Sequence, residues 1–293
     1  MSRRFQYPSR YSTKARLAPL CDIRPGSILP QLSRIIVYPV KSLPGIAVDQ
    51  AIMTAGGGLA HDREYALFGK DGRFINGKRN RAIHRLDASC AIVGDDIRVT
   101  IRTNGSVETF LLHGQQEHRA DIAALERRLS QHFNEAVSIK RDQDLGFPDD
   151  LDFPGPTVIS EATLAEVASW YPPLTAQDMR LRFRANLEFS DCPAFWEDRL
   201  YGKPGDEVAF QIGDVGLFGT NPCQRCIVPS RDPASGEELA DFKPNFVQRR
   251  RTTLPPWANR ARFDNAYRLA VNTRADGREA GKVLRLGDEV RIL

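Results

Sequence analysis

Cysteine is scarce in this 293-residue sequence, and its spacing excludes two common structural uses. The five cysteines are odd in number and irregularly placed, which argues against a disulfide scaffold and favours a reducing compartment. Cys223 and Cys226 form one Cys-x-x-Cys pair, and the five histidines show no paired ligand spacing. A zinc site would need a second ligand pair, which the sequence does not contain.

Several other functional patterns are also missing. No apolar run approaches the ~20 residues that a helix needs to span a bilayer. No helical pattern follows the glycines at 56–58, so they are typical of a turn rather than of nucleotide binding, and no Gly-x-Ser-x-Gly segment supports serine hydrolysis. The net charge of +4 is too small to predict nucleic-acid binding. We therefore expect neither a membrane nor a nucleic acid as partner.

Length and composition predict two packed globular domains. The chain has 41% hydrophobic and 27% charged residues, as ordinary soluble proteins do, and 293 residues exceed the usual size of one domain. Residues 146–156 are rich in Pro, Gly and Asp, so we expect domains over residues 31–145 and 150–293. Residues 1–30 are expected to form a tail or a targeting segment, because the first twenty are rich in Arg and Ser and contain no acid. We expect a cytoplasmic protein, with a mitochondrial location as the alternative.

Short stretches of alternating or β-branched residues, separated by glycine, predict a β-rich α+β fold. Residues 97–102 alternate apolar with polar, so one face of this strand should be buried. Asp121 is expected to cap one helix and Ser160 to cap another over residues 161–170. The three arginines at 249–251 are expected in a solvated loop, where they could dock an acidic redox partner. Further strands are expected at residues 34–38, 64–68, 73–75, 107–112, 137–140, 181–189, 208–212, 215–218, 267–272 and 290–293.

The residues around the Cys-x-x-Cys pair make Cys226 the strongest candidate for chemistry. Arg225 precedes it, and an adjacent guanidinium favours the thiolate, which is the nucleophilic and metal-binding form of cysteine. Thiolate sulfur also selects soft metal centres over hard cations. A thioredoxin-like pair would need Cys223 to open a helix, whereas residues 227–229 indicate an extended segment. Two buried, inert cysteines remain the alternative from the residues alone.

Two groups of motifs resemble the MOSC superfamily, molybdenum-cofactor proteins related to molybdenum cofactor sulfurase C-terminal domains and to the amidoxime-reducing component. Tyr-Pro-Val-Lys-Ser-Leu-Pro-Gly at 38–45, with Gly-Gly-Gly-Leu-Ala-His-Asp-Arg at 56–63, is similar to the N-terminal MOSC β-barrel domain. Arg-Ala-Asn-Leu at 184–187, with Cys-Gln-Arg-Cys at 223–226 and Asp-Pro-Ala-Ser-Gly at 232–236, is similar to the MOSC domain proper. The family usually has Arg-Pro-Asn where this chain has Arg184-Ala185-Asn186.

The resemblance implies a small N-terminal β-barrel-like domain packed on a MOSC β-barrel domain with a few peripheral helices. It implies that Cys226 is the catalytic residue and the protein ligand to molybdenum in a bound molybdenum cofactor (Mo-molybdopterin). Asp62 is expected to orient Arg63. The expected activity is reduction of small N-hydroxylated substrates, such as amidoximes, by cleavage of the N–O bond. The cofactor-binding residues that we expect are Lys41, Ser42, Arg63, Arg79, Arg184, Asn186, Arg225 and Cys226.

Electrons for such a reduction must come from outside the chain. A fused ferredoxin domain would show a Cys-x4-Cys-x2-Cys pattern, and no cysteine follows Cys226. The resemblance therefore implies a separate flavin, haem or iron–sulfur reductase as partner. Two alternatives remain. The chain could carry or deliver molybdenum cofactor or sulfur, with Cys226 bearing a persulfide whose sulfur is supplied by another protein. It could also be a structural barrel that has lost cofactor binding.

Overall fold

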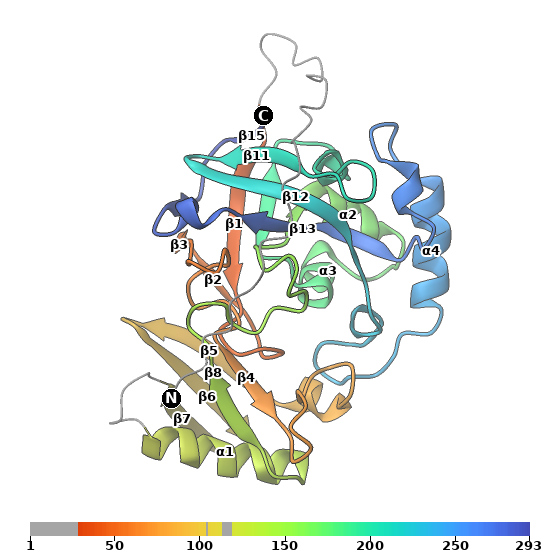
Figure 1. The fold of residues 1–293 in the computed structure, drawn as a ribbon. Coiled ribbons are helices and arrows are strands. Elements are labelled where there is room, and N and C mark those ends of the chain that lie inside the picture. Colours follow the sequence, from red (N-terminus) through yellow and green to blue (C-terminus); the bar gives the residue numbers. More distant parts are fainter. Residues whose placement is uncertain (1–28, 104, 113–118) are drawn as a thin grey trace.

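The computed structural model describes residues 29–103, 105–112 and 119–293 (Figure 1). Within these ranges the fold is β-rich α+β, with four sheets and four α-helices at their periphery, as expected. The strands are β1 (Gln31–Val37), β2 (Ile46–Val48), β3 (Gln50–Ile52), β4 (Tyr65–Phe68), β5 (Ala88–Val93), β6 (Asp96–Thr103), β7 (Ser106–Leu112), β8 (Ser138–Arg141), β9 (Val158–Ser160), β10 (Leu187–Ser190), β11 (Val208–Ile212), β12 (Val215–Gln224), β13 (Arg268–Ala275), β14 (Val283–Arg285) and β15 (Val290–Ile292). The helices are α1 (Arg119–Phe133), α2 (Glu161–Ser169), α3 (Ala176–Phe183) and α4 (Phe242–Thr252), with short 3-10 helices that include η1 (Arg81–Arg85). The targeting segment considered for the first residues lies outside the described ranges.

The largest sheet contains eight strands in the order β15-β11-β12-β13-β9-β10-β1-β2. Its neighbours are antiparallel except for β9 and β10, which are parallel. The strands β1 and β15, which come first and last in the chain, also approach each other. The Leu32 N–H donates to the Asp288 carbonyl and the Val290 N–H donates to the Pro30 carbonyl, both at 2.8 Å. The strand β1, which comes from the segment expected to form the N-terminal domain, therefore lies within the sheet of the C-terminal half.

Three apolar clusters of buried residues follow from this arrangement. One cluster belongs to the large sheet and contains Phe189 and Phe210, both completely buried. A second belongs to β4–β8 and α1, which we call the small domain, and contains Val99 and Leu129. The third contains Phe246 of α4 together with buried residues of α2 and α3. The helices α2–α4 therefore share one core beside the large sheet.

Several local expectations are confirmed. In β6, Ile97, Val99 and Ile101 are buried, as the alternating pattern predicts. The hydroxyl of Ser160 accepts a hydrogen bond from the Thr163 N–H at 3.1 Å, so Ser160 caps α2. The strands expected at 34–38, 64–68, 107–112, 137–140, 208–212, 215–218, 267–272 and 290–293 correspond to β1, β4, β7, β8, β11, β12, β13 and β15, with β12 reaching six residues further.

Other expectations are wrong for reasons of local geometry. Asp121 lies in the first turn of α1, and its carboxylate accepts from the Leu111 N–H at 2.9 Å instead of capping the helix. The strand expected at 181–189 begins only at Leu187, because a capping box between Thr175 and Asp178 starts α3 before it. Residues 73–75 return antiparallel beside β4, with a bridge between Phe68 and Phe74 and the Ile75 N–H donating to the Leu67 carbonyl at 2.9 Å, but they form no strand of their own, and the strand that pairs with β4 is β8.

The three arginines at 249–251 are not in a loop. They lie in the last turn of α4, and Arg250 is 1% exposed. A solvated position is wrong for Arg250, since its guanidinium pairs with the buried Asp198.

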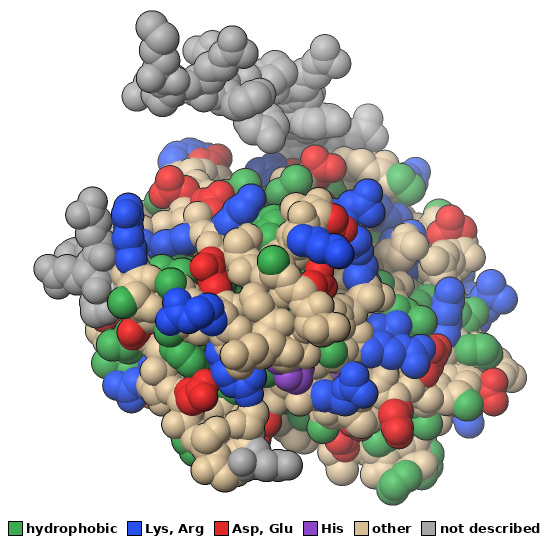
Figure 2. Space-filling view, turned by 90° about the horizontal axis from the view of Figure 1, so that it is seen from below, with side chains coloured by type: hydrophobic (Ala, Val, Ile, Leu, Met, Phe, Trp, Pro, Cys, Tyr) green, Lys and Arg blue, Asp and Glu red, His purple; other side chains and the backbone are tan. Residues whose placement is uncertain are grey.

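The molecular surface carries charges of both signs. Viewed from below, the face that includes the small domain shows many Lys and Arg side chains with carboxylates between them (Figure 2). None of the helices in the described ranges combines the length and the apolar character needed to cross a membrane.

Candidate functional site

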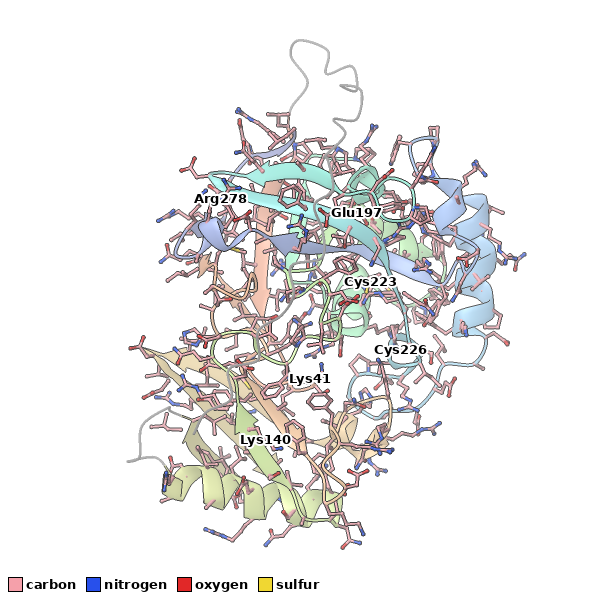
Figure 3. All side chains as sticks on the ribbon, viewed as in Figure 1. Lys41, Lys140, Glu197, Cys223, Cys226 and Arg278 are labelled. Carbon is pink, nitrogen blue, oxygen red and sulfur yellow. The ribbon has the colours of Figure 1, made fainter. Side chains whose placement is uncertain are left out.

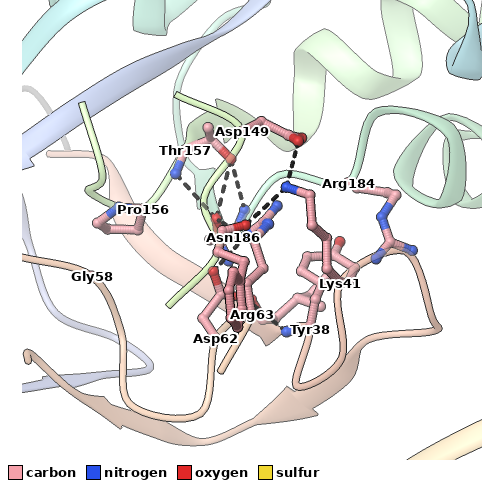
Figure 4. A network of polar contacts seen from close by, with 12 residues as sticks. Tyr38, Lys41, Gly58, Asp62, Arg63, Asp149, Pro156, Thr157, Arg184 and Asn186 are labelled. Atoms are coloured by element: carbon pink, nitrogen blue, oxygen red, sulfur yellow. Dashed lines mark hydrogen bonds and ion pairs between the residues drawn. The ribbon is translucent and has the colours of Figure 1, made fainter. Parts of the chain in front are cut away.

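Tyr38 is the centre of the site that the sequence motifs bring together (Figure 4). It follows β1 directly and is 4% exposed. The guanidinium carbons of Arg63 and Arg184 lie 5.2 Å and 4.0 Å from the centre of its ring. The hydroxyl donates to the Ala185 carbonyl at 3.2 Å, and burial raises the pKa of the phenol to about 12. The ring thus holds two guanidinium groups in one place.

Asn186 and Asp62 fix the orientation of Arg63. One guanidinium nitrogen of Arg63 contacts the Asp62 carboxylate and lies 3.4 Å from the Asn186 Oδ1, so Asp62 holds Arg63 as expected. Burial acts to lower the pKa of Arg63, but the negative charge of Asp62 outweighs it, and the pKa is raised. Asn186 is 1% exposed; its Oδ1 also accepts from the Thr157 N–H at 3.2 Å, and its Nδ2 donates to the Ile36 carbonyl at 3.0 Å.

Lys41 supplies a third cation to this group. Its Nζ donates to the Asp149 carboxylate at 2.6 Å and to the Phe147 carbonyl at 2.8 Å. The Lys41 side chain is 7% exposed, whereas that of Asp149 is 69% exposed. Burial lowers the pKa of Lys41, and the positive charges of Lys41 and Arg63 hold the pKa of Asp149 well below its usual range. The carboxylate therefore covers the buried ammonium from the solvent side. We call Lys41, Arg63 and Arg184 the cation cluster.

The backbone at these motifs is unusually constrained. Nine non-glycine residues in the described ranges have positive φ, and they include Ser42 (73°), His61 (63°), Arg63 (52°) and Arg184 (51°). Such conformations cost about 1–3 kcal/mol each and persist where the surrounding structure enforces them, often at functional sites. At Arg184 the left-handed conformation ends α3. It turns the chain into Asn186 within two residues.

The loop that carries Cys226 is attached to the same region (Figure 3). After β12 ends, Arg225 donates from Nε to the Leu269 carbonyl at 2.9 Å and from Nη1 to the Phe183 carbonyl at 3.1 Å. Phe183 directly precedes Arg184, so Arg225 links the cysteine loop to the cation cluster. The Val228 N–H donates to the Cys226 sulfur at 3.4 Å. Arg225 thus positions the loop, and its Nη2 is buried without a hydrogen-bond partner in the described part of the chain.

The other described cysteines differ from Cys226 in their surroundings. Burial raises the pKa of Cys90 and of Cys192 to about 12, so both thiols stay protonated at neutral pH. Cys223 lies within β12 and Cys226 beyond its end, and both are half-buried. Within residues 29–103, 105–112 and 119–293, no group of three or more His, Cys, Asp or Glu is placed to hold a metal ion.

The structure does not join every expected residue to this site, and it adds some that the sequence did not indicate. Arg79 is exposed and pairs with Asp71 at 2.9 Å, and the described contacts do not connect it to the cation cluster. Tyr38 and Thr157 were not expected to take part, although Tyr38 begins the first motif. Asp149 was also missed, because it lies in the Pro-, Gly- and Asp-rich segment that indicated a domain boundary.

A separate cleft of about 530 Å³ lies on another side of the cysteine loop. Its lining includes Tyr171, Arg182 and Glu238 and none of the expected site residues. Arg182 donates to the carbonyls of Pro229 and Arg231 at 3.1 Å and 2.6 Å, so it forms the wall between this cleft and the loop. Cleft size alone would therefore direct attention away from the cation cluster.

Comparison with known families agrees with the motifs. The MOSC N-terminal beta barrel domain matches residues 29–139, and the MOSC domain matches residues 157–291. The chain belongs to the MOSC-domain proteins. The two matches leave residues 140–156 unassigned, and Asp149 lies in that interval.

This MOSC-domain protein is similar to curated proteins of two kinds. It is 26% identical over 237 residues to the human mitochondrial amidoxime-reducing component 1, a match that covers 70% of this chain and 67% of the human protein. It is 24% identical over 246 residues to the bovine mitochondrial amidoxime reducing component 2, with coverages of 70% and 67%. It is also 25% identical over 238 residues to the molybdenum cofactor sulfurase of Caenorhabditis briggsae, and here the match covers 75% of this chain but 31% of the relative.

Proposed function

We propose that this MOSC-domain protein binds the molybdenum cofactor and reduces small N-hydroxylated substrates with electrons from a separate protein. One observation carries the proposal. The buried Lys41 and the half-buried Arg63 and Arg184 gather at one site, and Arg225 connects that site to the loop of the half-buried Cys226. The similarity to amidoxime-reducing components supports the choice of substrate class.

The residues at the site fit a pterin cofactor that carries a phosphate and needs a protein sulfur. Guanidinium groups match phosphate oxygens through paired N–H donors, and a lysine adds a point charge. Three cations face the two carboxylates of Asp62 and Asp149, so the site has a surplus of positive charge. Arg225 also has a buried Nη2 that no acceptor within the described ranges satisfies. Asn186 uses one Nδ2 hydrogen on Ile36, which leaves the other for a ligand.

The proposed chemistry divides between cofactor and protein. The cofactor would supply the two-electron cleavage of the N–O bond, in which N–OH, two electrons and two protons give N–H and water. Cys226 would be the protein ligand to the metal, and Lys41, Arg63 and Arg184 would neutralise the phosphate, with Ser42 and Asn186 as hydrogen-bonding partners. The electron donor would be a flavin, haem or iron–sulfur protein. We include a cytoplasmic location in the proposal, with a mitochondrial location as the alternative.

The Cys226→Ser variant tests the metal ligand directly. We expect molybdenum and pterin content to fall by more than about tenfold, because a hydroxyl is a poor replacement for a soft thiolate ligand. Protein is purified from a host that makes the cofactor, and molybdenum is measured by elemental analysis with zinc as the reference metal. Benzamidoxime reduction with an artificial electron donor should be lost in the same variant.

Cys223→Ser is the matched control for this test. It should keep most of the metal and the activity. Loss of metal in Cys223→Ser alone would show that the ligand is the sulfur of Cys223 and that our assignment to Cys226 is wrong. Wild-type protein that holds molybdenum but does not reduce benzamidoxime would favour a cofactor carrier. Absence of both molybdenum and pterin from the wild type would contradict the proposal.

A further inference from the structure

The segment of residues 70–85 holds an unusual concentration of positive charge. It contains six basic side chains and one acidic side chain, Asp71. Outside this segment, residues 29–293 contain 29 basic and 35 acidic side chains. A local net charge of +5 therefore stands against a net negative remainder. All six cations are exposed. They are Lys70, Arg73, Lys78, Arg79, Arg81 and Arg85. We call this segment the basic segment.

The basic segment forms one compact surface. Arg79 pairs with Asp71 at 2.9 Å, which joins the start of the segment to its middle. The Asn80 side chain accepts from the Ala82 N–H at 2.9 Å and begins η1. Arg81 pairs with Glu238 at 3.6 Å. Four cations have no ion-pair partner among the residues that the structure describes, namely Lys70, Arg73, Lys78 and Arg85. Their charge is therefore available to a partner.

The basic segment packs against the loop that carries Cys226. The guanidinium of Arg231 donates to the Gly77 carbonyl. A Cβ added at Gly77 would come within 3.2 Å of the Val228 side chain, so glycine permits this close contact. The positive charge of Lys78 also acts on both Lys41 and Asp149 and helps to lower their pKa values. The exposed cations therefore border the site that we propose for the cofactor.

We infer that the basic segment is the docking surface for the electron donor, and that this donor is a protein with an acidic surface. The inference rests on the proposed function, because it concerns the supply of electrons to that site. Complementary charge steers two proteins together and sets their orientation. A donor held on this surface delivers electrons beside the Cys226 loop. Each turnover oxidises two one-electron donors and consumes two protons.

The exposed arginines of α4 provide an internal comparison. Arg249 and Arg251 are also basic and exposed, but they lie in the last turn of α4, at the end that points away from the small domain (Figure 1). This last turn lies about 10–15 Å along the helix axis from the start of α4. A donor bound there would be further from Cys226.

The test reverses charge at positions that we have not assigned to the cofactor. The variant carries Lys70→Glu, Arg73→Glu and Arg85→Glu, and the control carries Arg249→Glu and Arg251→Glu. Binding of an acidic plant-type [2Fe–2S] ferredoxin, used as the probe, is measured by titration calorimetry on the full-length protein at low ionic strength, where charge is least screened. Benzamidoxime reduction driven by reduced methyl viologen is measured alongside.

We expect the triple variant to weaken ferredoxin binding at least tenfold and the control less than threefold. Wild-type affinity should fall steeply with added salt, and viologen-driven reduction should stay unchanged in the triple variant. Equal weakening in both variants, or no binding by the wild type, would overturn the inference. Tighter binding of single-stranded RNA or of anionic vesicles to the same cations would overturn the choice of partner. If viologen-driven reduction is absent in the wild type while ferredoxin binding still depends on the basic segment, the docking surface stands and the proposed function fails.

Discussion

Two regions of this protein bury charged side chains, and they do so in opposite ways. The three cations of the cation cluster have two carboxylate partners, Asp62 and Asp149, and the Asp149 side chain is 69% exposed. The second region, which we call the sealed triad, consists of Glu197, Asp198 and Arg250. It has two acids for one cation.

Fixed contacts hold the sealed triad together, while Glu197 Oε1 and the Nε and Nη1 of Arg250 have no hydrogen-bond partner in the described ranges. Arg250 pairs with Asp198, and the Glu197 carboxyl accepts from the Ser160 N–H at 3.2 Å and from the Thr163 hydroxyl at 3.1 Å. None of its three members is more than 3% exposed. Burial, assisted by the charge of Asp198, raises the pKa of Glu197 to about 7. The triad joins the segment after β10 to α4 and is almost fully removed from solvent.

The difference lies in whether the partner of each buried cation is itself buried or exposed. Both regions remove cations from water, which is unfavourable unless a partner compensates. In the sealed triad the partner is fixed and buried. In the cation cluster the partner of Lys41 is a carboxylate that faces solvent and can return to water at little cost. We therefore expect an external anion to displace Asp149 more readily than Asp198.

The largest effect on stability is expected from Arg250→Met. Removing this guanidinium leaves Asp198 buried without its counter-ion, so the free energy of unfolding should fall by about 3–5 kcal/mol. Urea unfolding monitored by circular dichroism measures it. The neighbouring Arg251→Met is the control, and because Arg251 is exposed its effect should stay within about 0.5 kcal/mol. A loss below about 1 kcal/mol in Arg250→Met would show that the triad is not sealed.

Glu197→Gln should change how stability depends on pH. The folded protein holds the Glu197 proton up to a pKa of about 7, whereas the unfolded chain releases it near 4.5, so the wild type loses stability as pH rises between these values. From pH 5 to pH 8 the wild type should therefore lose about 2–3 kcal/mol more than the variant. Unfolding free energies at the two pH values measure the difference. If the unfolding free energies of the two proteins change by the same amount from pH 5 to pH 8, Glu197 is already ionised in the folded protein.

Lys41→Met should have the smallest effect on stability and a clear effect on cofactor retention. The Asp149 carboxylate returns to solvent, so the free energy of unfolding should change by less than about 1 kcal/mol. Loss of one charged contact to the phosphate should reduce retained molybdenum and pterin about tenfold or more after dialysis. Lys140→Met, at an exposed lysine of β8, is the control for both measurements. Full retention in Lys41→Met would remove Lys41 from the cofactor site.

The sequence predicted those parts of the fold that depend on local patterns. Alternation at residues 97–102 indicated β6, and Ser160 indicated the start of α2, because a strand face and a helix cap each leave a short-range pattern. The helix α4 leaves a weak pattern, with Phe242 and Phe246 as its fully buried apolar residues. Its third buried residue, Arg250, depends on Asp198, which is 52 positions away in the sequence.

The same limit applies to the site. Lys41, Arg63, Arg184 and Asn186 lie in motifs, so they could be chosen before their contacts were known. Asp149 pairs with Lys41 across 108 positions, and nothing in its immediate neighbours indicates that contact. Long-range pairing is set by the packing of strands rather than by local sequence. The counter-charge of the proposed cofactor site is thus harder to predict than its cations.

The position of β1 has a consequence for any attempt to recombine these modules. This strand fills the interval between β10 and β2, and the chain continues from it directly into Tyr38 and Lys41. A fragment that starts at residue 150 would expose the unpaired edge of β10, which invites aggregation. A MOSC module grafted onto another protein must therefore bring its own first strand with it.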